Sequence, residues 1–378
     1  MKIYDPFRKR WFEEEIKLPI NVRAEALIVT FPFVDLHTHV RLNGGEDYFS
    51  LSRAAIAGGF LRLVIQPNTS PPLDDVGVLQ EHEKLARGKN VRYHWAVSLF
   101  GNLEPDGKKV VAYSTDGFRY DHVSLDDALS RKRKKAVIFD HSQVHELKGI
   151  FYRGASLPGA SRPISNEAIA MVRTVLTGVE NGFGRFHIQH LSTKLAVETL
   201  DYLRKYAYVT CEVTPHHLFF SWQDVKNADF KINPPLGSEE DRRALISAVK
   251  DGTINVLATD HAPHPEKPPD FMEAPFGTSN IEVAFSVFYT VLEDLELVVD
   301  KLTVEPLKIL NLQEKFTGQD LIVIDPEMEW IVDAGSLFTK GKNCVFNGVK
   351  LKGKVLGVRK SGKWIYWDGE FLESEVPA

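Results

Sequence analysis

The sequence has little of several residue types and patterns, and each shortage excludes a class of protein. Its 378 residues include only two cysteines, Cys211 and Cys344, which form no spacing motif. This usage fits a reducing cytosol and excludes both a disulfide scaffold and a cysteine-rich zinc site. No apolar run is long enough to span a membrane. Residues 1–12 are charged and show no signal peptide, so we expect a cytoplasmic protein.

The chain also lacks a strong excess of charge of either sign. Its net charge is −5 at pH 7, which argues against a general binder of nucleic acid or of membrane surfaces. One basic run, residues 131–135, leads into an apolar segment, and we interpret it as the solvated end of a helix. With 43% hydrophobic and 26% charged residues, the composition is that of an ordinary globular protein.

Short apolar segments rich in Val, Ile and Phe alternate with segments of helical periodicity. The predicted strands are residues 31–36, 60–65, 91–97, 110–113, 136–139, 185–188, 208–213 and 254–258. The clearest predicted helices are residues 50–57, 167–179, 194–205 and 239–250, with further helix-like stretches at 281–295 and 306–312. Apolar strands separated by helices are typical of parallel βα units, and eight of them predict an α/β fold of the (β/α)8 barrel type.

After Gly318 the pattern changes to strands and turns. Apolar segments occur at residues 321–324, 330–332, 355–358 and 364–367. We predict a barrel over residues 31–318 and a small β domain that combines residues 1–30 with residues 319–378.

The end of the first predicted strand carries the strongest chemical signal. Alternate residues of a strand share a face, so His37 and His39 point together into the barrel mouth, as two ligands of one metal ion would. Asp35 is one step deeper on that face, where it could orient an imidazole. Arg41 is one step outward, where its guanidinium could bind a carboxylate. Alone, a His-x-His pair is common and supports a metal site only weakly.

Other predicted strands also end in polar residues, and reactive groups of such barrels sit at these ends. The second, fourth, fifth, sixth and eighth strands lead into Asn68, Asp116, His141, His190 and Asp260. Each has an ordinary explanation by itself, such as an Asp-Gly turn at Asp116 or a histidine satisfied in the core. Together with His37 and His39, the histidines and aspartates at these ends form a set of imidazole and carboxylate groups that suits Zn²⁺, Mn²⁺ or Co²⁺.

These strand ends resemble the amidohydrolase superfamily and, within it, the bacterial type of the dihydroorotase family. The resemblance covers the barrel and part of the tail, in the family's order. It rests on the segments VDLHTHVR (34–41), QPNT (66–69), STDG (114–117), HIQHLST (187–193), CEVTPHHL (211–218), KINPPL (231–236), ATDHAPH (258–264), APFG (274–277) and GKN (341–343).

The resemblance implies a role for each matching residue. The more buried ion would be held by His37, His39 and Asp260, and a second ion by His190 with Asp116 as the bridge. Asp260 would also be the catalytic proton acceptor. The residues implied to hold the substrate are Arg41, Asn68, Asn233 and His264. The pair His216-His217 resembles a structural loop motif and is not expected to bind metal.

The sequence departs from the family pattern after the fifth strand. The family usually has a His-Cys-Glu-Asp run there, whereas this chain has Asp140-His141-Ser142-Gln143-Val144-His145. We assign His141 as the ligand, with Asp140 and His145 as alternatives. The sequence therefore allows either one or two ions per chain. The N-terminal region is also short, which predicts a truncated β appendage.

The resemblance implies the reversible hydrolysis of L-dihydroorotate to N-carbamoyl-L-aspartate in pyrimidine biosynthesis, with Zn²⁺ as the cofactor and Mn²⁺ or Co²⁺ as alternatives. Arg41 favours this anionic substrate over the neutral rings of a hydantoinase or an allantoinase, which are the first alternative. The second alternative is an inactive homologue that serves as a structural partner of aspartate carbamoyltransferase. We expect a small-molecule substrate, no nucleic acid, no membrane, and either a homodimer or a complex with that transferase.

Overall fold

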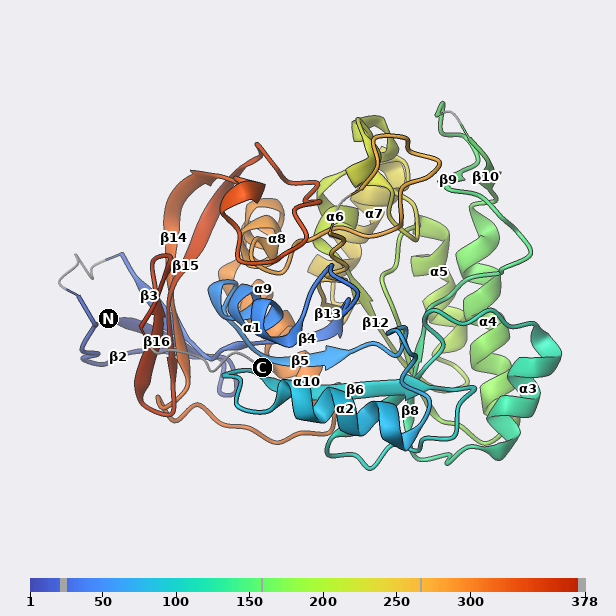
Figure 1. Ribbon diagram of the computed structural model, residues 1–378, viewed down its shortest axis with the longest axis horizontal. Helices are drawn as coiled ribbons and strands as arrows, with labels where there is room; N and C mark the ends of the chain where they lie inside the picture. Colours follow the sequence, from blue (N-terminus) through green and yellow to red (C-terminus); the bar gives the residue numbers. More distant parts are fainter. Residues whose placement is uncertain (21–25, 158, 266, 373–378) are drawn as a thin grey trace.

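The computed structural model describes residues 1–20, 26–157, 159–265 and 267–372. Its centre is a parallel sheet of eight strands that nearly closes into a barrel (Figure 1). In their order around the sheet these strands are β4 (Phe33–Thr38), β5 (Phe60–Ile65), β6 (Arg92–Ser98), β7 (Val110–Ser114), β8 (Val137–Asp140), β11 (Arg185–Ile188), β12 (Tyr208–Val213) and β13 (Val256–Leu257). The predicted (β/α)8 barrel is confirmed.

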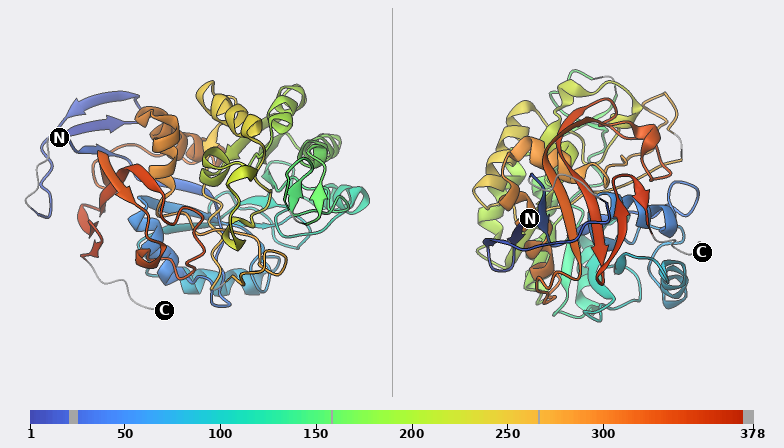
Figure 2. Two further views of the ribbon diagram at one scale, coloured as in Figure 1. Left: turned by 90° about the horizontal axis from the view of Figure 1, so that it is seen from above. Right: turned by 90° about the vertical axis from the view of Figure 1, so that its left-hand side faces the viewer.

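Helices follow most of these strands and cover the outside of the sheet (Figures 1 and 2). They are α1 (Tyr48–Ala57), α2 (Val76–Ala86), α3 (His122–Arg131), α4 (Ser165–Glu180), α5 (Lys194–Leu203), α6 (Pro215–Phe219), α7 (Glu239–Lys250), α8 (Ala284–Leu292), α9 (Leu295–Leu302) and α10 (Val304–Ile309). Short 3-10 turns occur at η1 (Trp222–Asp224), η2 (Ala228–Phe230) and η3 (Ala334–Ser336). Among the residues described, no helix has the length and apolarity needed to cross a membrane.

The basic run at residues 131–135 is only in part a solvated helix end. Arg131 closes α3, and its side chain is exposed, as is that of Arg133. Lys132, however, is buried, and its ammonium donates hydrogen bonds to the backbone carbonyls of Gly101 and Leu103. A buried ammonium needs such acceptors, so Lys132 has a structural role.

A second sheet of seven strands combines both ends of the described chain (Figure 2). Its strands, in spatial order, are β17 (Glu370–Phe371), β16 (Lys363–Trp367), β15 (Lys350–Lys360), β14 (Leu321–Ile331), β3 (Ile28–Thr30), β1 (Lys2–Asp5) and β2 (Arg10–Glu13). The segments predicted as separate strands at 321–324 and 330–332 are largely one strand, β14. The exact domain limits at residues 31 and 318 stay a prediction.

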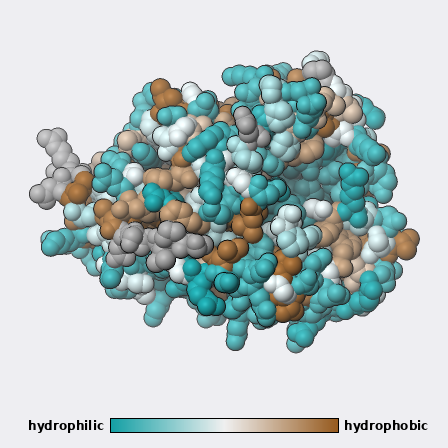
Figure 3. Space-filling view, in the orientation of Figure 1, coloured by the Kyte–Doolittle hydropathy of each residue, from teal (hydrophilic) through white to brown (hydrophobic). Residues whose placement is uncertain are grey.

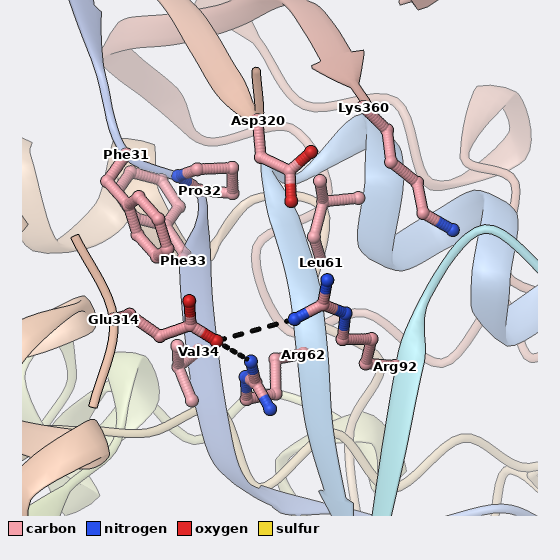
Figure 4. Close-up of a pocket in the computed structure, with 10 residues that line it drawn as sticks. All are labelled: Phe31, Pro32, Phe33, Val34, Leu61, Arg62, Arg92, Glu314, Asp320 and Lys360. Carbon is pink, nitrogen blue, oxygen red and sulfur yellow. Dashed lines mark hydrogen bonds and ion pairs between the residues drawn. The ribbon is translucent and has the colours of Figure 1, made fainter. Parts of the chain in front are cut away.

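The end of the barrel nearest this sheet contains a cleft lined by both apolar and charged side chains (Figure 4). The Glu314 carboxylate lies there between two guanidinium groups, 2.5 Å from Nη2 of Arg62 and 3.3 Å from Nη1 of Arg92. These arginines lie near the starts of β5 and β6, so the cleft is at the N-terminal end of the barrel, opposite the end where such barrels carry their active sites.

The side chain of Asp35 links the first and last barrel strands. Strands β4 and β13 end the sheet order, and an isolated bridge between Thr38 and His261 connects their ends. Asp35 accepts hydrogen bonds from the backbone N–H and the hydroxyl of Thr259, at 2.9 and 2.6 Å, and from the backbone N–H of His37. Its expected role as the partner of an imidazole is therefore wrong, because both of its oxygens are used to close the barrel.

Candidate metal centre and active site

A pocket opens at the C-terminal ends of the barrel strands, where the sequence predicts the site. It is lined by His37, His39, Arg41, Asn68, Asp116, His141, His190, Asn233, Asp260, Ala262, Phe276 and Gly277. Nine of the ten predicted site residues thus share one pocket, and His264 is the exception. The surface elsewhere, on the face that Figure 3 shows, is mostly hydrophilic, with small separate hydrophobic patches.

His37 is oriented by a carboxylate from a strand that only β13 separates from its own. Its Nδ1 lies 2.6 Å from Oε1 of Glu212, which comes from β12, and the other oxygen of Glu212 lies 2.9 Å from Nε2 of His187. A carboxylate can only accept, so Nδ1 of His37 carries the proton and Nε2 is left with a lone pair. Glu212 is fully buried, yet the charges and hydrogen bonds of His37 and His187 lower its pKa to about 2 against the effect of burial.

His39 is held in the same tautomer by an amide. Oδ1 of Asn68 lies 2.7 Å from Nδ1 of His39, and Nδ2 of Asn68 donates to Asp116 over 3.2 Å. Because the Asp116 carboxylate can only accept, the amide nitrogen must face it and the amide oxygen must face His39. Nδ1 of His39 therefore donates, and its Nε2 also presents a lone pair to the pocket.

Asp116 lies at the centre of the ligand set. Its Oδ2 lies 3.6 Å from Nε2 of both His37 and His39, and its Oδ1 lies 3.5 Å from Nδ1 of His141. The next residue, Gly117, has φ +83°, and a Cβ there would meet Cβ of Asn68 at 2.3 Å. The glycine of this Asp-Gly pair is thus required for Asn68 to approach Asp116, so the turn and the site are parts of one arrangement.

Asp260 and His190 leave their strands in the left-handed region, with φ of 46° and 36°. This conformation is unfavourable for residues other than glycine and is often found where a side chain must reach a functional site. Oδ1 of Asp260 lies 3.0 Å from Nε2 of His39 and 3.4 Å from Nε2 of His37. The ring of His190 is 5.2 Å from that of His37 between centroids.

The fifth strand places His141, and not its two alternatives, in the pocket. Nδ1 of His141 lies 2.8 Å from Nε2 of His190. Asp140 is fully buried beside them, but its oxygens accept from the hydroxyls of Ser142 and Thr115. His145 does not line the pocket, and its ring packs against another aromatic residue, Tyr120.

The residues expected to hold the substrate have different surroundings. Arg41 lines the pocket, and in the described part of the chain its buried Nε has no hydrogen-bond partner. Asn233 also lines it, although its amide oxygen accepts from Arg162. His264 lies outside the pocket lining, because its Nε2 donates to the carbonyl oxygen of Phe276 over 2.7 Å. Of the pair expected to be structural, His217 contacts the Thr214 hydroxyl and the Pro234 carbonyl, which agrees with that expectation.

The arrangement of lone pairs fits a bound cation. With both protons on Nδ1, the Nε2 atoms of His37 and His39 face the carboxylates of Asp116 and Asp260, so acceptors face acceptors in a buried space. Nε2 of His37 and Oδ2 of Asp116 are buried with no hydrogen-bond partner among the residues that the structure describes. Such groups need a positive charge between them. Ligand atoms of His37, His39 and Asp116 lie within 4.8 Å of one another, a spacing that a single divalent ion can span.

The charges of the site favour a cation in the same way. Burial disfavours the charged form of His37, but Asp260, Glu212 and Asp116 together raise its pKa well above its usual value. The pKa of Asp260 is well below its usual range, because His37 and His39 outweigh the effect of burial. A divalent ion gains from the same carboxylates that would otherwise draw a proton to His37.

Sequence reasoning missed two residues that shape the site. Glu212 is an acidic residue inside the apolar strand β12, and that unusual position was the available signal. Arg162 lies in a small pair of strands, β9 (Phe151–Tyr152) and β10 (Ser161–Arg162), within the long connection after β8. No periodic pattern marks these two-residue strands, so Arg162 could not be assigned.

Comparisons with known proteins place this geometry in a family. No family model matches the chain. By sequence it is 56% identical over 375 residues to a Thermotoga maritima protein named "Putative dihydroorotase", covering 99% of both chains. It is 33% identical to the dihydroorotase of Aquifex aeolicus, covering 92% of this chain and 89% of the relative, and 32% identical to that of Bacillus subtilis, covering 93% and 90%.

Solved structures show the same fold at lower sequence identity. A D-hydantoinase from a Thermus species superposes with a TM-score of 0.81 at 18% identity, covering 97% of this chain and 91% of that one. An L-hydantoinase from Arthrobacter aurescens gives a TM-score of 0.78 at 21% identity, covering 96% and 90%. The sequence similarity to the dihydroorotases is much higher than that to the hydantoinases, and it extends over the full length. This chain therefore belongs to the dihydroorotase family, whose members are hydrolases of a cyclic amide bond.

Proposed function

We propose that the pocket hydrolyses L-dihydroorotate to N-carbamoyl-L-aspartate, reversibly, with a divalent metal ion as cofactor. The observation that carries the proposal is the meeting of imidazole lone pairs and carboxylates at buried positions, with the cationic Arg41 on the same pocket wall. The first feature calls for a metal ion, and the second suits a substrate with a carboxylate.

Six residues would hold the metal. His37, His39 and Asp260 would bind one ion, and His141 and His190 would bind a second, with Asp116 between the two positions. Imidazole and carboxylate ligands favour Zn²⁺, and Mn²⁺ or Co²⁺ would also fit. When bound, such an ion supplies Lewis acidity and lowers the pKa of a coordinated water toward neutrality. Glu212 and Asn68 keep the two histidines of the first strand in the tautomer that can bind metal.

The chain's own groups would carry the proton transfers. Asp260 would take a proton from the attacking water and return it to the ring nitrogen as the C–N bond breaks. Its pKa is well below the usual range, so Asp260 is ionised at neutral pH, as a proton acceptor must be. In the reverse direction the same carboxylate takes a proton from the ureido nitrogen as the ring closes.

Arg41 would select the substrate by its charge. Its buried Nε has no hydrogen-bond partner within the described residues, so its guanidinium is available to a ligand carboxylate. Dihydroorotate carries a carboxylate on its ring, whereas hydantoin and allantoin rings carry none. Asn68 and Asn233 would border the ring. A contact of His264 with the substrate needs its ring to leave the carbonyl oxygen of Phe276.

An assay of the purified protein with defined metal content tests this function. The protein is stripped with a chelator, reloaded with Zn²⁺, Mn²⁺ or Co²⁺, and assayed with dihydroorotate, hydantoin and allantoin. We expect activity to return with metal and to be highest on dihydroorotate. Preference for a neutral ring would transfer the assignment to a hydantoinase or an allantoinase.

The same experiment addresses the inactive alternative, together with its assembly. A protein that binds less than one ion per chain and turns over none of the three rings would be an inactive homologue. Against this alternative, all six proposed ligand residues are present and line one pocket. The homodimer and the complex with aspartate carbamoyltransferase stay predictions. Sedimentation of the protein, alone and mixed with the transferase, would test both. Cell fractionation would test the predicted cytoplasmic location.

A further inference from the structure

His141 is contacted on both sides of its ring. Its Nδ1 faces the proposed metal site, 2.8 Å from Nε2 of His190 and 3.5 Å from Oδ1 of Asp116. Its Nε2 faces away from that site, 3.0 Å from Nδ2 of Asn233 and 3.4 Å from Oε1 of Gln143. The position of the ring proton therefore decides which side of His141 can accept and which can donate.

Arg162 determines which end of the Asn233 amide faces His141. Nη2 of Arg162 lies 2.8 Å from Oδ1 of Asn233. A guanidinium has only donors, so the amide oxygen must face Arg162 and the amide nitrogen must face His141. A reversed amide would set donors against donors at Arg162.

Arg162 is itself rigidly held. It is 4% exposed, and its Nε donates to the carbonyl oxygen of Gly149 over 2.8 Å. Gly149 has φ +155°, and a Cβ at this position would lie 2.2 Å from the backbone nitrogen of Arg162. The close approach of the two backbones, which only glycine allows, fixes the guanidinium beside Asn233.

This amide orientation opposes metal binding by His141. An ion bound at Nδ1 needs the lone pair of that atom, so the ring proton must move to Nε2. There the N–H meets the N–H of Asn233, and the acceptor within reach is Oε1 of Gln143, which lies 3.0 Å from the same Asn233 nitrogen. With the proton on Nδ1 instead, Asn233 donates to Nε2 without conflict.

We propose that Arg162 is a positioning residue that acts through Asn233 to weaken the second ion position, at His141 and His190. The inference rests on the proposed metal centre and goes beyond it, since it makes the two positions unequal. His37 and His39 receive their proton acceptors from Glu212 and Asn68 and bind the first ion tightly. The second ion then binds loosely and exchanges.

Metal titration of the stripped protein tests this proposal without any substrate. Zn²⁺ is added in competition with a chromophoric chelator, and bound metal is counted by elemental analysis. We expect two unequal binding steps in the unaltered protein. In Arg162→Met the Asn233 amide is free to turn its oxygen toward Nε2 of His141, and the second step should tighten roughly tenfold, the value of one hydrogen bond. The first step should not change.

A second variant covers the case in which Arg162→Met does not fold. Asn233→Asp keeps the partner of Arg162 and offers an acceptor oxygen to His141, so the second step should again tighten. The matched control is Arg204→Met, which removes another arginine that donates to backbone carbonyls, those of Val209 and Thr253, and it should alter neither step.

Two results would overturn the proposal. One is an unaltered protein that binds two ions with equal affinity. The other is an unchanged second step in both Arg162→Met and Asn233→Asp. Because the readout is metal affinity, a failure to hydrolyse dihydroorotate would leave the result valid, and the two proposals can fail separately.

Discussion

The carboxylate of Glu212 lies 2.6 Å from Nδ1 of His37, and these residues are 175 positions apart in the chain. Strand β12 thereby fixes the tautomer of a ligand on strand β4, with β13 between the two strands around the barrel. The same carboxylate also contacts His187, so one acidic residue joins three strands. Such partners of metal-binding histidines influence affinity nearly as strongly as the ligands do.

Replacement of Glu212 by Gln should weaken metal binding while leaving the ligand set unchanged. The amide oxygen can still accept from His37, but the negative charge that makes the imidazole a better ligand is lost. We expect the affinity for the first ion to fall roughly 10- to 100-fold. Competition with a chelator measures this. An affinity equal to that of the unaltered protein would show that the contact is only structural.

Replacement of Asp260 by Asn should remove the proton acceptor. We expect kcat to fall by a factor on the order of 1,000 or more, since general base catalysis contributes about 100- to 10,000-fold and a proposed metal ligand is altered too. Steady-state kinetics on dihydroorotate measures the loss, and circular dichroism checks the fold. Turnover within a factor of about ten of the unaltered protein would assign proton transfer to another group.

Replacement of Arg41 by Met should affect substrate binding more than metal binding. A charge-assisted hydrogen bond to the substrate carboxylate is lost, so we expect KM for dihydroorotate to rise roughly 100-fold. Activity on a neutral hydantoin should not fall by a comparable factor. Equal losses on the charged and the neutral ring would argue against carboxylate recognition by Arg41.

The stability of the protein should fall between pH 6.5 and pH 4, in part because of His94. Burial and the neighbouring Arg62 lower the pKa of His94 from 6.5 to about 4 in the folded protein. Nη1 of Arg62 donates to Nε2 of His94 over 2.7 Å. The lone pair of Nε2 that would bind a proton is therefore already used as the acceptor. Within the window the unfolded chain takes up a proton that the folded chain does not, so the free energy of unfolding decreases as the pH falls.

Urea unfolding at pH 7 and pH 5 measures this effect. In His94→Gln the difference in free energy between the two pH values should be smaller than in the unaltered protein, because the group that gains a proton on unfolding is gone. If both proteins lose the same amount, His94 does not contribute to the pH dependence. The experiment is done on metal-free protein, so that loss of metal at low pH does not add to the result.

The sequence pattern predicted the barrel well because its strands are buried on both faces and therefore appear as continuous apolar runs. β5, β11 and β12 have the predicted bounds. Helices α2 and α3 were not among the clear predictions, and both expose much of their surface, so their apolar periodicity is weak. Arg162, which lies in the β9–β10 pair, could not be predicted for a similar reason, because two-residue strands show no periodicity.

The strand ends predicted which residues line the pocket, because the position of a side chain along a parallel strand follows from the pattern. The partner of each side chain does not follow from it. From the sequence, Asp35 was expected to orient a histidine. In the structure Asp35 instead accepts hydrogen bonds from Thr259, and Glu212 orients His37. Both acids lie inside the barrel, and only the register between distant strands distinguishes their roles.

The contact between Asp35 and Thr259 has a consequence for how the protein matures. It joins the first barrel strand to the last, over a separation of 224 residues, and His39 meets Asp260 across the same seam. A chain still on the ribosome, or one cut before its last strand, keeps both histidines. It lacks Asp260 and the closed barrel that brings the ligands together. Tight uptake of metal would then mark chains that have been synthesised and closed to the end, and metal would stabilise those chains selectively.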